Sequence, residues 1–332
     1  MKDWKTILKH DPTNWLLEKD NPSVRYWTLR KLGGLKDDAK LDQEKTAIMQ
    51  SDIIKTIMAN QGADGYWAGG PDIYLPKYRA STHQLKILAE MGATINLGIK
   101  KGIERIFDSQ LDSGHFATKP PKTARGRASK LVDGICLTGN VLYYLIHFGY
   151  LEDARTQRAI QFVVETHTKE CGWMCRAYPI DKNRVYPENC FMGSIKPLIA
   201  FSMIPQKKRS SKMNEIIKKN IEMVLENKVF MYLRDKYNKR KAKYGWTRFG
   251  FPLFYNSDIL EILGLLTDLG IKDPRTKEAI DVVLNHQLND GKWLLHHSFN
   301  GKMYKDIEEK GKPSKWITLR ALYALKGQLS SG

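Results

Sequence analysis

The hydrophobic and polar positions of this chain follow a helical period in two kinds of segment. Residues 273–288 carry one apolar stripe on a polar background, formed by Ile280, Val283, Leu284 and Leu288. This spacing predicts an amphipathic helix. Residues 258–269 are instead apolar on nearly every side, which predicts a helix buried almost all round. The chain is therefore predicted to combine surface helices with buried ones.

These two kinds of segment recur as an internal repeat. Residues 151–173 and 271–293 align without a gap and share an Asp-x-Arg-Thr start and a closing Trp. The closing turn, Gln-x-x-x-Gly-x-aromatic at 287–293, recurs at 61–67 and 110–116. Self-similarity at a fixed period indicates one supersecondary unit used several times. A period near fifty residues also suits propeller blades, but the helical pattern favours an outer helix, a glycine–aromatic turn and an inner helix in each unit.

Six inner helices are predicted, beginning near residues 22, 79, 134, 190, 256 and 314. Open solenoids usually end in polar capping repeats. Here the last inner helix is as apolar as the middle ones, and residues 21–32 resemble residues 312–323. We therefore predict an all-α fold, an α/α toroid of six inner and about six outer helices, in one domain over residues 1–332 with a basic insertion at 205–245. An open HEAT-like solenoid is the alternative, because the Asn-Pro-Ser-Val-Arg start is typical of such repeats.

The composition of the chain predicts a large core and the compartment in which the protein resides. The chain has 332 residues, of which 42% are hydrophobic, so it can bury a large core. Four cysteines do not make a disulfide scaffold in a chain of this size, which predicts the reducing cytoplasm. No signal peptide is expected in residues 1–18, and no membrane span, because the most apolar stretch, 131–151, carries polar residues.

Half of the net charge of +18 lies in one stretch, residues 207–243, which holds 13 Lys/Arg and 4 Asp/Glu. A solvated insertion that aids solubility explains this stretch. A patch for the phosphates of a nucleic acid or for a peripheral contact with an anionic membrane is the alternative. No helix-turn-helix or RNA-recognition signature accompanies it.

The repeat resembles that of the terpenoid cyclases and protein prenyltransferases, from about residue 21 to residue 326. The overall layout also resembles a widespread microbial family with prenyltransferase/squalene-oxidase repeats. The resemblance implies a ring with a central active cavity at the N-terminal ends of the inner helices. Converging helix N-termini would also present N–H groups and positive dipole ends to an anion such as a diphosphate.

Two motifs of that superfamily distinguish a class II cyclase from a prenyltransferase. An Asp-x-Asp-Asp acid motif is absent from the sequence, so a class II cyclisation by protonation is not expected. Residues 126–136, Gly-Arg-Ala-Ser-Lys-Leu-Val-Asp-Gly-Ile-Cys, resemble the prenyltransferase β-subunit segment in which Arg and Lys hold diphosphate and Asp and Cys hold zinc. The resemblance assigns these roles to Arg127, Lys130, Asp133 and Cys136. One extra residue, Ile135, turns the Asp/Cys pair by about 100° on a helix, and the family's histidine ligand has no counterpart at 315–318.

The positions of three cysteines within the repeat suggest a metal site. Cys136, Cys175 and Cys190 fall at comparable places near inner-helix starts, and His83 begins an earlier inner helix. Three thiolates and an imidazole suit tetrahedral zinc. We therefore predict zinc as the cofactor, held by His83, Cys136, Cys175 and Cys190. Small buried hydrophobes are the alternative reading of these cysteines.

The remaining candidates surround the expected cavity. Arg79, Arg127 and Lys130 are predicted to bind a diphosphate or other anion. Asp133 and Asp258 are the candidate catalytic acids, although Asp133 also suits a helix N-cap. The predicted cavity-lining aromatics, for which core packing is the alternative, are Tyr26, Tyr78, Tyr255 and Trp316.

Two functions follow from these candidates. The first is a metal-dependent, prenyltransferase-like enzyme that acts on an isoprenoid or lipid diphosphate in the central cavity. The second is a non-enzymatic binding module that captures a lipid, peptide or nucleic acid through the ring and its basic insertion. The fold alone does not choose between them, because one fold hosts unrelated activities. The need for a partner subunit is left open.

Overall fold

The computed structural model describes residues 4–35, 38–129, 134–168, 172–174, 190–234 and 239–330. In this part of the chain the structure is mostly helical, with one two-stranded antiparallel hairpin formed by β1 (Met231–Arg234) and β2 (Lys239–Ala242). None of the described helices is long and apolar enough to cross a membrane. The predicted helical class is confirmed, and the hairpin adds to it.

The inner helices begin within a few residues of the predicted starts. α2 (Pro22–Trp27) continues as the π-helical segment η2 (Thr28–Leu32), and every residue of α5 (Ser81–Glu90) is buried. The others are α8 (Ile135–His147), α10 (Phe191–Met203), α12 (Ile259–Asp268) and α14 (Lys315–Leu329). Along the chain from α5 to α14, each of these helices packs against the next, so their apolar sides cover one another.

The outer helices bury one face each. α6 (Leu97–Phe107) is a clear case, because its buried residues recur at helical spacing. The others are α3 (Asp38–Gln50), α4 (Asp52–Ala59), α9 (Ala154–Glu165), α11 (Ser211–Glu226) and α13 (Lys277–Asn285). Shorter segments connect these elements: η1 (Trp4–Ile7), α1 (Thr13–Leu16), α7 (Ala124–Arg127), η3 (Gln206–Lys208), η5 (Tyr244–Thr247) and η6 (Pro274–Thr276).

The structure gives the repeated Asp-x-Arg a physical role. Asp153 accepts the Arg155 backbone N–H at 2.8 Å at the start of α9. The Arg155 guanidinium then donates to both oxygens of Glu104 on α6, at 2.6 and 3.0 Å. Arg275 repeats this arrangement, with Asp273 beside it and Glu222 of α11 across from it. The motif therefore caps one outer helix and ties it to the preceding one.

The repeated Gln joins its glycine turn to the start of the next outer helix. Gln110 Nε2 donates to Gly114 O and to Arg155 O, both at 2.8 Å. Gln61 makes the same pair of bonds to Gly65 O and Gly98 O. The turn glycines need their positive φ and lack of Cβ, since a Cβ on Gly114 would lie 2.4 Å from Arg158 O.

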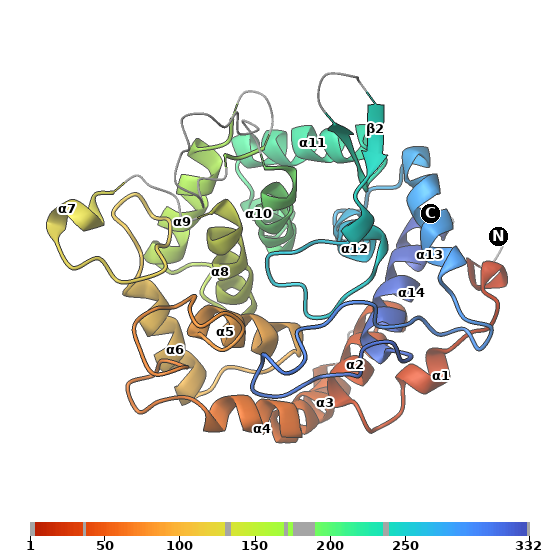
Figure 1. The fold of residues 1–332 in the computed structure, drawn as a ribbon, viewed down its shortest axis with the longest axis horizontal. Coiled ribbons are helices and arrows are strands. Elements are labelled where there is room, and N and C mark those ends of the chain that lie inside the picture. The colour runs from red at the N-terminus through yellow and green to blue at the C-terminus, as the bar shows by residue number, and fades with distance from the viewer. Residues whose placement is uncertain are drawn as a thin grey trace.

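The last turn makes this contact with the first segment of the chain. Gln287 Nε2 donates to Gly291 O at 3.0 Å and to His10 O at 3.2 Å. Lys326 Nζ on α14 donates to Leu32 O at 2.7 Å, and Lys315 pairs with Glu18 at 2.8 Å. Figure 1 shows α14 beside α2 accordingly. The first and last elements therefore lie side by side.

We expect Gln287→Ala to lower the free energy of unfolding by roughly 1–3 kcal/mol, because it leaves the buried Gly291 carbonyl and the partly buried His10 carbonyl without their donor. Urea unfolding measures the change. Gln157→Ala is the matched control, since Gln157 is exposed and its side chain, among the described residues, donates to Leu151 O alone. Its effect should stay below about 0.5 kcal/mol. An equal loss in both variants would contradict a role of Gln287 in joining the chain ends.

The stretch predicted as an insertion contains an ordinary outer helix. α11 buries one face, which includes Met213, Ile217, Ile221 and Val224. The dense charge of residues 207–243 concealed this apolar stripe, because the stripe takes few positions among many lysines. The insertion into the repeat is therefore shorter than the predicted residues 205–245, and it centres on the β1–β2 hairpin.

Candidate functional site

A loop between η5 and α12, residues 248–257, lies among four inner helices, and we call it the central loop. Phe251 stacks on Trp316 of α14, with ring centroids 4.3 Å apart. Asn140 of α8 donates to Phe254 O at 3.2 Å, and the Phe254 ring lies 5.0 Å from that of His83 on α5. Lys196 of α10 donates to Asn256 O. This loop therefore fills much of the space where the resemblance placed a central cavity.

Buried ion pairs hold the inner helices around this loop. Lys196 Nζ on α10 lies 2.6 Å from Glu261 Oε1 on α12, and both side chains are almost fully buried. On α5, Lys86 pairs with Glu90 at 3.1 Å, and Arg320 of α14 lies 3.7 Å from the same carboxylate. Burial lowers the pKa of Lys86, and the charge of Glu90 opposes that shift. Each buried charge therefore depends on its partner.

The inner-helix N-termini are mostly capped by the chain itself. Asp258 Oδ1 accepts from Glu261 N at 2.9 Å, and Ser314 Oγ accepts from Ile317 N at 2.9 Å. Asn21 and Cys190 cap α2 and α10 in the same way. These four termini therefore have fewer free N–H groups for an anion than the ring geometry alone suggested.

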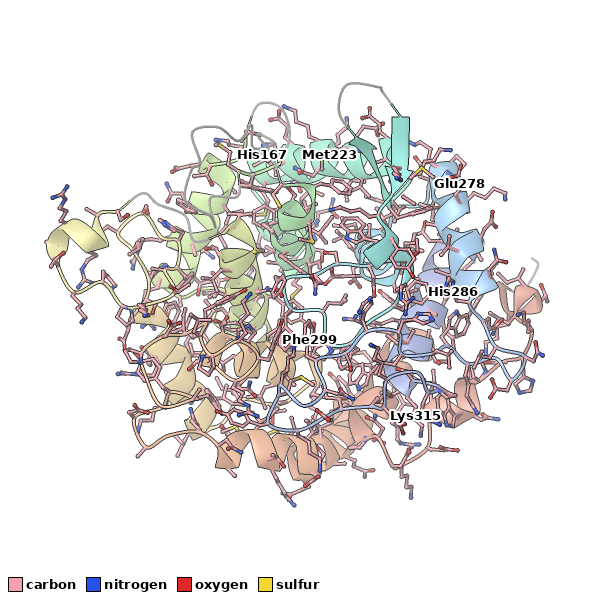
Figure 2. All side chains as sticks on the ribbon, in the orientation of Figure 1. His167, Met223, Glu278, His286, Phe299 and Lys315 are labelled. Atoms are coloured by element: carbon pink, nitrogen blue, oxygen red, sulfur yellow. The ribbon has the colours of Figure 1, made fainter. Side chains whose placement is uncertain are left out.

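A cavity of about 580 Å³ lies beside the central loop, and we call it the η5 cavity. Its walls come from the start of α10, from η5, from the central loop and from residues 297–299, with aromatic surfaces from Tyr244, Trp246 and Phe299. Figure 2 places Phe299 near the middle of the molecule. The volume lies within the range of small-molecule sites.

The charges of the η5 cavity are positive. Lys243 and Arg248 are among its lining residues, and no described Asp or Glu is. Lys243 Nζ lies 4.6 Å from the Trp246 ring centroid, and burial lowers the pKa of Lys243. Arg248 donates to the Tyr244 hydroxyl at 2.8 Å. The cavity thus presents cations next to aromatic surface.

Two further polar groups line the η5 cavity. Ser257 is 3% exposed, and its hydroxyl has no hydrogen-bond partner among the described residues. Burial lowers the pKa of His297, and the nearby positive charge of Arg248 adds to this shift, so the ring is neutral at physiological pH. His297 can therefore accept a proton from a ligand, whereas Ser257 contributes a buried, unpaired hydroxyl to the cavity wall.

The predicted cavity aromatics lie elsewhere. Tyr78 stacks on Phe299 at 4.2 Å, and its hydroxyl lies 3.1 Å from that of Tyr255. Tyr26 accepts a hydrogen bond from Arg30. None of the four predicted aromatics, Tyr26, Tyr78, Tyr255 and Trp316, lines the η5 cavity. The sequence signal that could have found this cavity is the run 243–248, Lys-Tyr-Gly-Trp-Thr-Arg, which joins two cations and two aromatics.

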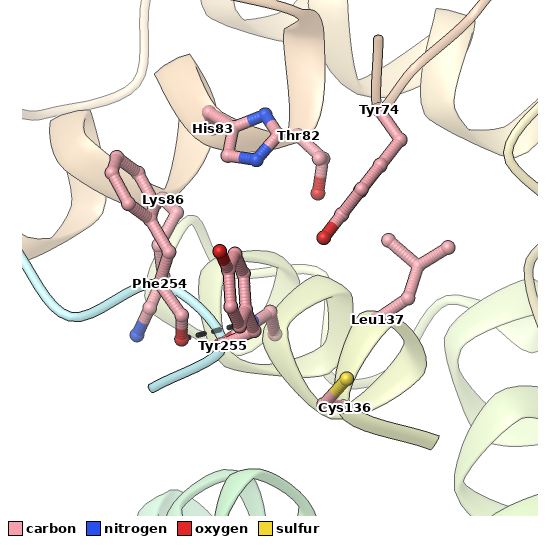
Figure 3. Close-up of a pocket in the computed structure, with 9 residues that line it drawn as sticks. Tyr74, Thr82, His83, Lys86, Cys136, Leu137, Phe254 and Tyr255 are labelled. Atoms are coloured by element: carbon pink, nitrogen blue, oxygen red, sulfur yellow. Dashed lines mark hydrogen bonds between the residues drawn. The ribbon is translucent and has the colours of Figure 1, made fainter. Parts of the chain in front are cut away.

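The predicted metal ligands surround a much smaller space. His83 and Cys136 line a cavity of about 10 Å³ together with Tyr74, Thr82, Leu137 and Tyr255 (Figure 3). That volume holds about one water molecule. Burial lowers the pKa of His83 to about 3. Cys190 accepts the Gly193 N–H at 3.1 Å as a helix cap, and Cys175 lies outside the described residues.

Within the described ranges, no group of three or more His, Cys, Asp and Glu side chains could hold a metal ion. His83 is instead packed between aromatic rings, 5.0 Å from Tyr74 and 5.0 Å from Phe254. The described residues therefore do not make up the predicted tetrahedral zinc set, and the part of that set that needs Cys175 stays a prediction.

The described members of the predicted anion site, Arg79 and Arg127, do not line the η5 cavity. Arg79 is exposed and lies over the Tyr304 ring at 5.7 Å. Arg127 is exposed on α7, which projects at the edge of the molecule (Figure 1). Lys130 and Asp133 lie outside the described residues. The described cations that line the η5 cavity are Lys243 and Arg248 instead.

Asp258 serves as a helix cap and as an anchor of the central loop. Besides capping α12, its second oxygen accepts the Gly250 N–H at 3.1 Å. The carboxyl is fully buried, and burial raises its pKa to about 6. Asp258 is not among the residues that line the η5 cavity, so we assign it a structural role.

This assignment predicts a pH dependence of stability. The pKa of Asp258 is higher in the folded protein than in the unfolded chain, so its protonated form is favoured by folding. The stabilisation of the folded protein by protonated Asp258 is complete below about pH 4. It is lost as the pH rises through about 6, at up to about 1.4 kcal/mol per pH unit. The stability difference between wild type and Asp258→Asn, measured by urea unfolding from pH 4 to 7, should follow this curve. A difference that is independent of pH would contradict it.

Comparison with known proteins gives structural neighbours only. No family model matches the chain, and no curated protein matches it. A protein from Actinoplanes is similar in structure, with 13% identity, a TM-score of 0.43, and coverage of 93% of this chain and 89% of that one.

Type II terpene cyclases are similar to about the same degree. The apo enzyme MstE from Scytonema shows 12% identity and a TM-score of 0.46, with coverage of 92% of this chain and 87% of that one. A variant of MstE in complex with geranylgeranyl dihydroxybenzoate shows 13% identity and a TM-score of 0.45, with coverage of 93% and 87%. These TM-scores lie below 0.5, so the similarity assigns no functional role to residues of this chain.

Proposed function

We propose that this protein binds an anionic amphiphile of the isoprenoid diphosphate kind in the η5 cavity of a closed α/α toroid. The bond from Gln287 to His10 supports the closure, because it repeats the contact that joins neighbouring units elsewhere in the chain. The observation that carries the ligand class is the pairing of Lys243 and Arg248 with aromatic walls in one cavity of about 580 Å³.

Each part of the ligand has a chemical counterpart. A diphosphate group would accept hydrogen bonds from Arg248 and Lys243, and arginine suits phosphate oxygens because of its planar fork of donors. An apolar chain would lie against Trp246 and Phe299, since aromatic rings supply large apolar area.

The same groups indicate what this cavity would contribute to a transfer reaction. Cations placed beside a departing diphosphate stabilise the charge that develops on it. His297, held neutral by its surroundings, would accept a proton from an attacking nucleophile. A metal is not part of this proposal, because the described residues do not make up a ligand set.

The test is isothermal titration with farnesyl diphosphate and with its two halves, farnesol and inorganic diphosphate. We expect farnesyl diphosphate to bind at least about tenfold more tightly than either half, because it contacts the cations and the aromatic wall together. Binding should weaken as salt is raised. Absence of binding to farnesyl diphosphate, together with salt-sensitive binding of DNA or RNA, would overturn the proposal in favour of a nucleic-acid module.

A further inference from the structure

A second cavity lies beside Arg320 of α14, and we call it the Arg320 cavity. Its volume is about 120 Å³, and it shares no lining residue with the η5 cavity. Lys31 and Tyr323 in its wall are partly exposed, so a ligand can enter from solvent. The wall is rich in aromatic rings, which belong to Trp27, Tyr143, Phe251, Trp316 and Tyr323.

The guanidinium of Arg320 has hydrogen-bonding capacity to spare. Among the described residues its polar contacts are long, at 3.5 Å to Gly250 O and 3.7 Å to Glu90 Oε1, whereas a well-formed N–H···O bond is about 2.9 Å long. A guanidinium carries five N–H donors. The Arg320 side chain is 22% exposed and lines the cavity, so donors of this group are available to a ligand.

A second cation, Lys31 of η2, lines the same cavity. Its Nζ lies 4.2 Å from the ring centroid of Tyr323 and 5.7 Å from that of Trp27, and both rings are part of the wall. The ion pair of Lys31 with Asp268 is 3.5 Å long, and the two side chains are 32% and 37% exposed. Such an exposed pair is weak, so Lys31 can pair with an anion in the cavity instead.

The lining charges leave an excess of one positive charge. Lys31 and Arg320 are the cations among the described lining residues, and Glu90 is the carboxylate. Burial would raise the pKa of Glu90, but the charges of Lys86 and Arg320 lower it, so the carboxylate is ionised. Lys86 is its closer partner, at 3.1 Å. Arg320 is therefore the cation that a ligand can engage.

The helix ends near the cavity oppose an anion only weakly. The C-terminus of a helix carries partial negative charge on its free carbonyl groups. Here Glu90 O, at the end of α5, accepts the Trp27 indole N–H at 2.9 Å, and Leu32 O, at the end of η2, accepts from Lys326 Nζ at 2.7 Å. These two carbonyl groups are therefore already satisfied.

We infer that the Arg320 cavity binds a small aromatic monocarboxylate, with its carboxylate on Arg320 and Lys31 and its ring against the aromatic wall. A planar guanidinium matches a carboxylate with two parallel N–H···O bonds. One carboxylate also balances the excess charge, whereas a phosphate monoester carries about −1.5 to −2 at neutral pH.

The size and the wall of the Arg320 cavity suit one aromatic ring. A cavity of about 150 Å³ takes benzene in another protein, so about 120 Å³ suits a single six-membered ring whose carboxylate lies at the partly exposed Lys31. Contacts between aromatic rings add to the burial of apolar area. An aromatic ring is therefore favoured over an aliphatic ring of similar size.

The experiment is a calorimetric titration of the full chain with benzoate and with three compounds of similar size. Benzyl alcohol lacks the charge, benzylamine reverses it, and cyclohexanecarboxylate keeps it on an aliphatic ring. We expect benzoate to bind saturably, the first two to bind at least about tenfold more weakly, and the third about threefold more weakly. Equal binding of benzoate and benzyl alcohol would overturn the role of the cations, and no saturable binding of benzoate would overturn the inference.

Two variants locate the binding. Arg320→Lys keeps a positive charge beside Glu90 but loses the planar fork, so benzoate affinity should fall about three- to tenfold. Lys31→Gln removes the partly exposed cation, and the affinity should fall about two- to fivefold and depend less on salt. Circular dichroism and the urea midpoint check that each variant folds, and Lys31→Gln decides alone if Arg320→Lys does not.

Lys77→Gln is the matched control. Lys77 is also an exposed lysine over two rings, those of Tyr74 and Tyr255, but it lines neither cavity. Its substitution should leave benzoate affinity within about twofold of wild type. Unchanged affinity in the folded Arg320 and Lys31 variants would overturn the assigned site. Farnesyl diphosphate binding tests the η5 cavity separately, because the two cavities share no lining residue.

Discussion

Replacing Lys196 by methionine is expected to lower the free energy of unfolding by about 3–5 kcal/mol. Lys196 is 1% exposed and donates to both oxygens of Glu261, at 2.6 and 2.8 Å. Its removal leaves a buried carboxylate without its cation and also removes a donor from Asn256 O in the central loop. Urea unfolding at neutral pH measures the change.

The double variant Lys196→Met/Glu261→Leu separates the charge from the packing. It should recover most of the lost stability, because replacing a buried pair by apolar residues is often neutral or stabilising. Lys277→Ala is the surface control, since its pair with Asp281 is largely exposed, and the expected effect is below about 0.5 kcal/mol. A double variant that is less stable than Lys196→Met would contradict the interpretation that each of these two buried charges depends on the other.

Arg248→Gln is expected to weaken farnesyl diphosphate binding by about 10- to 100-fold, since a hydrogen bond to a charged group contributes about 1.5–3 kcal/mol. Arg248 lines the η5 cavity and holds the Tyr244 hydroxyl at 2.8 Å. Glutamine keeps a polar side chain, which is shorter than that of arginine, but loses the charge. Isothermal titration measures the change, and the affinity of Arg248→Gln should also depend less on salt than that of wild type.

Arg79→Gln is the matched control for this prediction. Arg79 is an arginine over an aromatic ring, Tyr304, but it does not line the η5 cavity. Its substitution should leave the affinity for farnesyl diphosphate within about twofold of wild type. A larger loss in Arg79→Gln than in Arg248→Gln would place the anion site where the sequence first suggested.

The helices and their order could be read from the sequence because they depend on local signals. The apolar run 258–269 is contiguous in the chain, so the place and the burial of α12 followed from it. Asp258, predicted as a candidate catalytic acid, is the N-cap of this helix. The Asp-x-Arg repeat indicated a helix start, but its second role could not be read, because Glu104 and Glu222 lie on other helices. Pairing between elements depends on the fold as a whole.

The candidate site was harder to predict for the same reason. Lys196 stands alone in an apolar helix, and its partner Glu261 is 65 residues away. The central loop contains ordinary aromatic and proline residues, and nothing in 248–257 indicates that it enters the space between four inner helices. This loop fills much of the middle, and the η5 cavity lies beside it, lined by Lys243 and Arg248 and not by the predicted Arg79 or Arg127.

The most direct test of the central claim is photocrosslinking with a farnesyl diphosphate analogue that carries a benzophenone on its apolar chain. Mass spectrometry of the digested protein then identifies the labelled residues. The account predicts labelling on residues that line the η5 cavity, Met192, Leu253 or Phe299, and loss of that label when farnesyl diphosphate is added in excess. Labelling confined to other surfaces, or labelling that excess farnesyl diphosphate does not reduce, would contradict it.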